Sequence, residues 1–141
     1  DQISYKTTYV NKVTAQKEWV IVDAENQVLG RLASKVAKLL EANTNRPLLR
    51  LKIAEKVVLT GNKLTDKLYT RHTGYPGGQR HTSPAAVLKV HPERVIEHAV
   101  RGMLPKNRLG RAVLKNLHLY AGTEHKHEAQ QPKVIDLNSL N

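Results

Sequence analysis

A short apolar run followed by a helical repeat constrains the fold of this chain most. Residues 19–22 read Trp-Val-Ile-Val and are followed by Asp23, a pattern that predicts a buried strand. Leucine, alanine and valine then recur at spacings of three and four over residues 29–40, which predicts an amphipathic helix with one face on a core. Residues 56–60 predict a second buried strand. The order strand, helix, strand indicates an α/β domain with a parallel pair of strands.

Turn and cap signals divide the next part of the chain. Residues 68–70 predict a short strand that runs into a loop over residues 71–80, in which three glycines and one proline fall within five residues. Ser83 and Pro84 predict the start of a helix that continues to Val90.

The last third of the chain follows the same logic. Pro92 opens a helix whose apolar stripe ends near Gly102, and Asn107 caps a further helix over residues 109–114. Residues 117–120 alternate apolar and polar side chains and predict the final strand. From Gly122 onward we expect a polar tail.

Length and composition exclude several classes of protein. A chain of 141 residues with 40% apolar content is sufficient for one core. The absence of cysteine excludes a disulfide scaffold, a thiolate zinc site and a cysteine nucleophile. Residues 1–18 contain no apolar run like that of a secretion signal, and no segment reaches the length of a membrane span. We therefore expect neither secretion nor membrane insertion.

The positive charge is concentrated in one part of the chain. Lys and Arg number 23 against 12 Asp and Glu, for a formal charge of +11, and residues 67–123 hold ten of these cations and only two acids. An excess of one sign repels itself unless a polyanion neutralises it, so this segment predicts a nucleic-acid partner. An anionic membrane surface is the alternative. It fits less well, because Gly and Pro interrupt the basic residues, which therefore do not line one amphipathic helix.

Two segments within this region have the composition of contact sites. The loop over residues 71–80 combines Arg71 and Arg80 with a stacking ring, Tyr75, and with glycines that let backbone N–H groups approach phosphates. The alternative is an ordinary flexible loop. Residues 101–115 hold five cations without an acid. Lys106 and Arg108 stand in a turn between helices, where their side chains can converge on one phosphate. The alternative is a solvated interhelical turn.

Catalytic and metal-binding patterns are sparse. His125 and His127 have residue types that bind metals, but the zincin spacing is missing, and we interpret them as polar contacts of a C-terminal hook that extends to RNA. The sequence has neither a phosphate-binding loop nor a nucleophile elbow. Asp23 stands where catalytic residues lie in α/β folds, but we favour a helix cap or a partner for a nearby cation as its role.

Six ordered blocks give the chain a close resemblance to one family. They are WVIVDA (19–24), LGRLAS (29–34), KVVLTGNK (56–63), DKLYTRHTGYPGGQR (66–80), HPERVIEHAVRGMLPKNRLGR (91–111) and LHLYAGTEHKHEAQQP (117–132). In this order they resemble ribosomal protein thirteen of the large subunit, in its bacterial form. The GMLP and YAG-x-EH segments are the most distinctive.

The resemblance implies a fold and a role. It implies a single three-layer α/β/α domain on a small, mainly parallel sheet, which we place at residues 19–132, between an N-terminal extension (1–18) and a C-terminal tail (133–141). It also implies a structural, non-catalytic protein of the large ribosomal subunit that binds large-subunit rRNA, supports early assembly, contacts neighbouring ribosomal proteins and needs no cofactor. Localisation is then cytoplasmic and ribosome-bound, with an organelle ribosome as the alternative.

The candidate RNA-binding residues combine the basic segments with the matched blocks. They are Lys63, Lys67, Arg71, His72, Tyr75, Gly77, Gly78, Arg80, Arg101, Lys106, Arg108, Arg111, Lys115, His125 and His127. Two other functions are the alternatives. A free regulatory protein would bind mRNA through the same surface, and a small enzyme would use Asp23 with the His-rich tail.

One segment departs from the family pattern. Residues 41–55 read EANTNRPLLRLKIAE, shorter than the family segment and without its Gly-Asp turn or the Asn-Ala at the end of its strand. Residues 48–53 are the candidate for a replacement strand.

Overall fold

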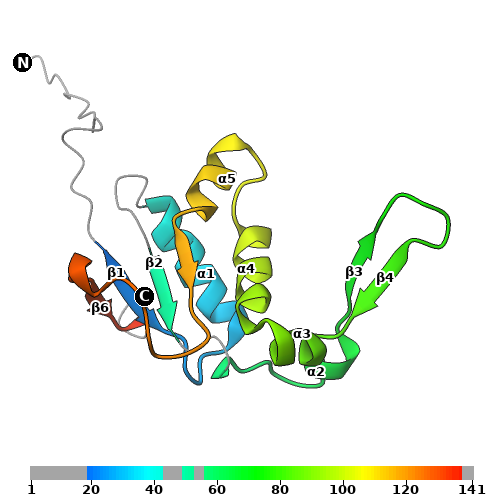
Figure 1. Ribbon diagram of the computed structural model, residues 1–141, viewed down its shortest axis with the longest axis horizontal. Helices are drawn as coiled ribbons and strands as arrows, with labels where there is room; N and C mark the ends of the chain where they lie inside the picture. Colours follow the sequence, from blue (N-terminus) through cyan, green and yellow to red (C-terminus); the bar gives the residue numbers. More distant parts are fainter. Residues whose placement is uncertain (1–18, 43–48, 53–55, 138–141) are drawn as a thin grey trace, which may run out of the picture.

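The computed structural model describes residues 19–42, 49–52 and 56–137. This part of the chain forms one body from which a hairpin projects (Figure 1). Its elements are, in chain order, β1 (Val20–Asp23), α1 (Leu29–Ala42), β2 (Leu49–Lys52), α2 (Lys63–Asp66), β3 (Tyr69–His72), β4 (Gln79–Thr82), α3 (Pro84–Val90), α4 (Pro92–Met103), α5 (Arg108–Leu114), β5 (Leu117–Leu119), the 3-10 turn η2 (Glu128–Gln130) and β6 (Lys133–Ile135).

Four short strands form a parallel sheet in the order β5-β2-β1-β6. β1 is central, with Ile21 opposite Arg50 of β2 and Val22 opposite Ile135 of β6. α1 connects β1 to β2, as a parallel pair requires. The predicted single α/β domain on a small parallel sheet is confirmed, and so is the replacement strand, since β2 lies within residues 48–53. Residues 41 and 42 of the divergent segment end α1, and residues 43–48 and 53–55 lie outside the described residues.

The predicted strand at residues 56–60 is wrong. Val58 forms only an isolated parallel bridge to Val28, through hydrogen bonds from the Val58 N–H to the Gln27 carbonyl (3.0 Å) and from the Leu29 N–H to the Val58 carbonyl (3.0 Å). Val57 is buried, but Val58 is 40% exposed. The β-branched run therefore predicts extended backbone correctly. It pairs with the residue just before α1 and does not enter the sheet.

One face of the sheet carries the hydrophobic core. Val20 and Val22 belong to the same buried cluster as Val36 of α1 and as Ile96 and Val100 of α4. Figure 1 shows α1 and α4 side by side. Full burial of a side chain of this size stabilises a fold by about 1.5–3 kcal/mol. The apolar periodicity of the two helices thus predicts their buried faces correctly.

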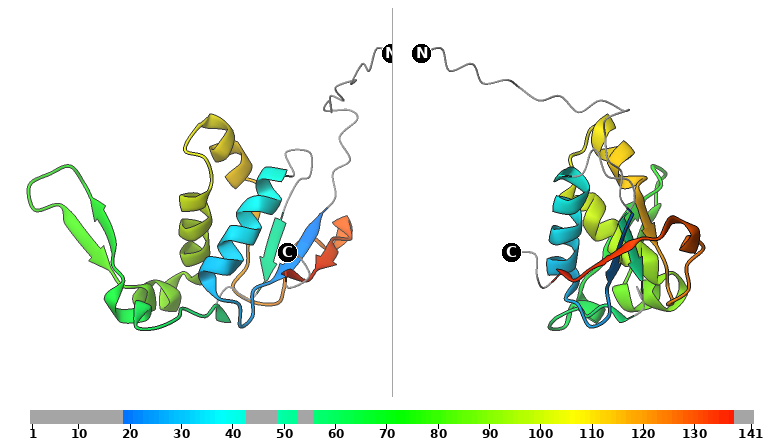
Figure 2. Two further views of the ribbon diagram at one scale, coloured as in Figure 1. Left: turned by 180° about the vertical axis from the view of Figure 1, so that it is seen from behind. Right: turned by 90° about the vertical axis from the view of Figure 1, so that its left-hand side faces the viewer.

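The other face of the sheet is covered by the segment that carries η2. Ile21 is buried outside the main cluster, and the ring of Trp19 lies 5.3 Å from that of His127. Because successive side chains of a strand point to opposite faces, Trp19 and Ile21 lie opposite Val20 and Val22. The right-hand view of Figure 2 accordingly shows the strands between α1 and the segment that carries η2.

The expected polar tail is also wrong. Residues from Gly122 onward contain η2 and β6, so β5 is not the last strand, and Leu137 is buried in the core. The Lys133 N–H donates to the Trp19 carbonyl at 2.8 Å, and Lys35 Nζ donates to the Leu137 carbonyl at 2.6 Å. β6 forms because the free edge of β1 offers backbone partners that a local pattern does not reveal.

Local signals predicted α1, α3, α4 and α5 well, but they missed the short helix α2. The Ala86 N–H donates to Ser83 Oγ at 3.4 Å, and the Gly110 N–H donates to Asn107 Oδ1 at 2.7 Å, as expected for capping side chains. Pro92 opens α4, which ends at Met103. Among the helices in the described part of the chain, none combines the length and the apolar content needed to cross a bilayer.

Burial of Leu137 gives a direct test of the C-terminal contribution to the core. Leu137 is 3% exposed and Val134 is 77% exposed. We expect Leu137→Ala to lower the free energy of unfolding by about 2–5 kcal/mol in a urea titration, because it leaves a cavity. The matched variant Val134→Ala changes it by less than about 0.5 kcal/mol. Equal effects would contradict the placement of Leu137.

The turn before α5 depends on a glycine. A Cβ on Gly110 would collide with the Pro105 carbonyl oxygen, whereas Gly30 in α1 has open space around it. We expect Gly110→Ala to cost about 1–3 kcal/mol of unfolding free energy through overpacking, and Gly30→Ala to be neutral or stabilising by up to about 1 kcal/mol. Thermal melts of both variants check this, and a Gly110→Ala protein as stable as wild type would argue against the close approach.

Candidate nucleic-acid interface

The β3–β4 hairpin extends away from the rest of the molecule (Figures 1 and 2). All four residues of β4 are exposed, and in β3 only Tyr69 is partly buried. The sequence predicted β3 to within one or two residues but missed β4, whose residues Gln-Arg-His-Thr have no apolar alternation. An isolated two-stranded hairpin is only marginally stable in water unless it packs against other elements. Because its strands are exposed, this hairpin lacks most of that packing.

Two arginines face each other on this hairpin. Arg71 and Arg80 are direct cross-strand partners, so their Cβ atoms lie about 4.5–5.5 Å apart on one face. Like charges placed directly opposite each other destabilise a hairpin. Neither arginine forms an ion pair with an acid in the described part of the chain. The pair therefore presents an uncompensated double positive charge to solvent.

The hairpin turn is built from Tyr75, Pro76, Gly77 and Gly78. The Gly78 N–H donates to the Tyr75 carbonyl at 2.9 Å, and Gly77 has φ of +70°. Proline followed by a glycine with positive φ is the sequence of a type II turn. Gly78 is needed as well, since a Cβ there would lie 2.8 Å from the Tyr75 carbonyl oxygen. The turn holds the ring of Tyr75 outward, 75% exposed.

The second face of the hairpin is ordered by polar contacts. Thr70 Oγ1 and His81 Nδ1 are 3.0 Å apart across the strands. His72 Nδ1 accepts the Gly74 N–H at 2.9 Å. His72, a predicted contact residue, thus also shapes the loop that carries Tyr75.

Tyr69 anchors the base of the hairpin to α4. Its ring centroid lies 4.9 Å from that of His98, and Lys67 Nζ lies 5.5 Å from the same ring. Burial raises the pKa of Tyr69 above its ordinary value. The ring contact connects the hairpin to the second predicted segment, because His98 is one helical turn before Arg101.

The second predicted segment surrounds a cleft between α4 and α5. Arg101, Lys106 and Arg111 line this cleft, which has a volume of about 490 Å³. Arg108 and Lys115 are exposed at the two ends of α5 and lie outside the lining. The turn predicted from Asn107 thus brings three of the five cations of this segment together.

A neighbouring cleft of about 410 Å³ holds the remaining predicted lysines. Lys63 and Lys67 line it, and His98 and Gly102 line both clefts. The sequence analysis did not identify His98. Its spacing of three residues from Arg101 on a predicted helix was the signal that could have found it.

His125 and His127 lie elsewhere. Figure 1 shows the segment that carries η2 at the end of the molecule opposite the hairpin. The ring of His127 packs between Trp19 and His118, at 5.3 and 5.6 Å, and His125 Nδ1 accepts the His127 N–H at 3.4 Å. Among the described residues, no three His, Cys, Asp or Glu side chains are grouped as a metal site would require. In this position, the His127 ring contributes to packing on the sheet.

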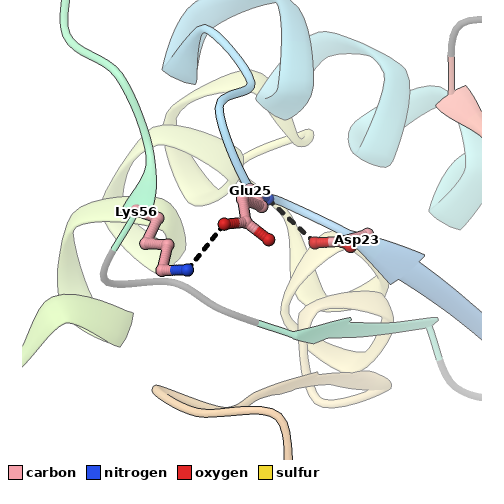
Figure 3. A network of polar contacts seen from close by, with 3 residues as sticks. All are labelled: Asp23, Glu25 and Lys56. Atoms are coloured by element: carbon pink, nitrogen blue, oxygen red, sulfur yellow. Dashed lines mark hydrogen bonds and ion pairs between the residues drawn. The ribbon is translucent and has the colours of Figure 1, made fainter.

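The enzyme candidate Asp23 belongs to a local network (Figure 3). Asp23 Oδ1 accepts the Glu25 N–H at 2.9 Å, and Glu25 Oε1 pairs with Lys56 Nζ at 2.6 Å. Asp23 therefore orders the turn after β1. The Lys56 ion pair also contrasts with the predicted contact cations at residues 63–115, none of which pairs with a described acid.

Comparisons of the sequence with known proteins identify the family of this chain. The family model described as "Ribosomal protein L13" matches residues 17–126. The chain is 50% identical over 137 residues to "Large ribosomal subunit protein uL13" of Desulfotalea psychrophila, covering 91% of this chain and 95% of the relative. It is 48% identical to the proteins of the same name from Halorhodospira halophila, covering 94% and 99%, and from Thermoanaerobacter sp. strain X514, covering 86% and 92%. This chain belongs to the ribosomal protein L13 family.

Proposed function

We propose that this chain is a structural, non-catalytic protein of the large ribosomal subunit and that it binds large-subunit rRNA through one basic surface. The term basic surface denotes here α2, the hairpin, the adjoining part of α4, the turn into α5 and α5 itself. Its cations are Lys63, Lys67, Arg71, Arg80, Arg101, Lys106, Arg108, Arg111 and Lys115. Family membership supports the assignment to the ribosome, and the geometry supports the choice of surface.

The facing pair Arg71 and Arg80 carries the proposal. The two side chains share one face of a hairpin that is exposed on both sides, and described acids neutralise neither of them. An RNA phosphate between or beside the guanidinium groups removes their repulsion and adds charge-assisted hydrogen bonds. Binding thereby supplies the support that packing does not give the hairpin. The hairpin is therefore suited to insertion into folded RNA.

The chemistry of the surface favours backbone and shape recognition. Arginine and lysine contact phosphates, which position a protein on RNA without reading much sequence. Tyr75 adds a ring at the tip of the hairpin, where an unpaired base can stack on it. A contribution to early subunit assembly follows from such a mechanism, because a basic surface that contacts several RNA segments holds them together before further proteins join.

Regulatory binding to mRNA would use the same basic surface. Co-sedimentation with large subunits at high salt distinguishes the two, since a ribosomal constituent remains with the particle. Neighbouring ribosomal proteins complete the proposed set of partners.

Removing the facing arginines tests the proposal. We expect the double variant Arg71→Ala, Arg80→Ala to bind a large-subunit rRNA fragment more weakly. The slope of log Kobs against log salt should also become shallower by about 0.7–0.9 for each phosphate that the variant no longer neutralises. Filter binding at several salt concentrations measures both quantities.

Two controls separate local contacts from net charge. Lys38→Ala with Lys126→Ala removes two exposed cations from α1 and from the segment before η2, so it has the same net charge as the arginine variant. We expect its slope to remain that of wild type. Arg71→Lys with Arg80→Lys keeps the charge and should keep most of the slope. If the variant without Arg71 and Arg80 and the variant without Lys38 and Lys126 had equal slopes, a specific role for the hairpin would be refuted.

A further inference from the structure

The cleft between α4 and α5 has features that phosphate contact alone does not require. Its volume of about 490 Å³ is within the range of about 300–1,000 Å³ that small-molecule sites occupy. Leu104, Pro105 and Leu114 contribute apolar walls. A surface that only follows an RNA backbone needs cations but not an apolar recess. The cleft is therefore suited to a ligand that combines an anionic group with a flat apolar one.

The charge of the cleft comes from three separate backbone positions. Arg101 extends from the last turn of α4, Lys106 from the following loop, and Arg111 from the last turn of α5. The lining contains no acid, and none of these three side chains pairs with an acid among the described residues. Charge-assisted hydrogen bonds from converging cations are the usual way in which proteins hold a phosphate group.

Two glycines keep the cleft open. Gly110 permits α5 to approach the Pro105 carbonyl, and Gly102 leaves its side of α4 without a side chain. A Cβ built at Gly102 has nothing within 4 Å, and the residue has ordinary helical backbone. A larger residue at position 102 would therefore enter free space in the cleft without straining the fold.

The position of the cleft indicates the source of its ligand. His98 lines the cleft and at the same time contacts Tyr69 at the base of the hairpin, with 4.9 Å between ring centroids. The cleft thus continues the basic surface from the hairpin toward α5. The cleft therefore lies next to the base of the hairpin that carries Arg71 and Arg80. RNA recognition commonly uses unpaired bases that are turned out of the stack.

We propose that the α4–α5 cleft receives one unstacked nucleotide of the bound rRNA. Arg101, Lys106 and Arg111 hold its phosphate, and the base lies against the apolar wall of Leu104 and Leu114. This inference rests on the proposed function, because it takes the nucleotide from the same RNA that binds the hairpin.

The variant Gly102→Leu tests the inference in the full chain bound to deproteinised large-subunit rRNA. The leucine occupies the cleft but removes no charge. We expect affinity to fall about tenfold or more, as when one stacked base is removed, while the salt slope keeps its wild-type value, since every cation remains available to phosphate. Base-specific chemical probing should show one nucleotide that is protected by wild type and reactive with Gly102→Leu.

Control variants identify the cleft that is responsible. Gly102 and Gly30 both line the neighbouring cleft, but only Gly102 lines the α4–α5 cleft, and Gly30 also has open space around it. Gly30→Leu should therefore bind like wild type, and an equal loss of affinity would overturn the assignment. Gly102→Ala should show a smaller loss than Gly102→Leu. Circular dichroism and melting temperatures confirm that the variants are folded.

The remaining outcomes separate this inference from the proposed function. If Gly102→Leu binds as wild type does while the Arg71 and Arg80 variant is weakened, the inference is wrong and the proposed function stands. If wild type shows no salt-dependent affinity for the rRNA, the proposed function is wrong. Nucleoside 5′-monophosphates that bind the free protein in a Gly102-dependent manner would identify a free-nucleotide site and overturn the rRNA assignment.

Discussion

The packing of α1 and α4 against one face of the parallel sheet holds the rest of the molecule in place. Val20 and Val22 of β1 meet Val36 of α1 and Ile96 of α4 in a core without charged side chains. Outside β2, the described Lys and Arg side chains are exposed or half-buried. Where surface acids are near, as for Lys56 and Glu25, charges pair locally. On the hairpin and in the α4–α5 turn they do not, and the protein is complementary to a polyanion there.

Much of the fold was predictable because its determinants are local. The caps at Ser83 and Asn107 and the apolar stripes of α1 and α4 lie within the elements that they specify. The errors fall where pairing is decided at a distance. Residues 56–60 have strand composition but find only one bridge. β4 has no apolar residue and β6 only the pair Val134 and Ile135, and both strands pair because β3 and β1 present open edges to them.

The candidate site was predictable in outline for a different reason. One-sided charge, glycines and an exposed ring are visible in the sequence, and they indicated the segments at residues 71–80 and 101–115. Three-dimensional relations were not visible. The register that sets Arg71 opposite Arg80, and the role of His98 between the hairpin and the cleft, depend on the folded chain. His127 has a polar side chain, but its ring packs near Trp19, which sequence spacing does not reveal.

The central claim is that the hairpin and the α4–α5 turn contact rRNA. Crosslinking in intact large subunits, with the RNA nucleotide and the peptide of each crosslink mapped together, tests this most directly. The account predicts protein–RNA crosslinks concentrated at residues 71–80 and 106–111. Crosslinks confined to the exposed part of α1 or to residues 122–131, with none in the two basic segments, would contradict it.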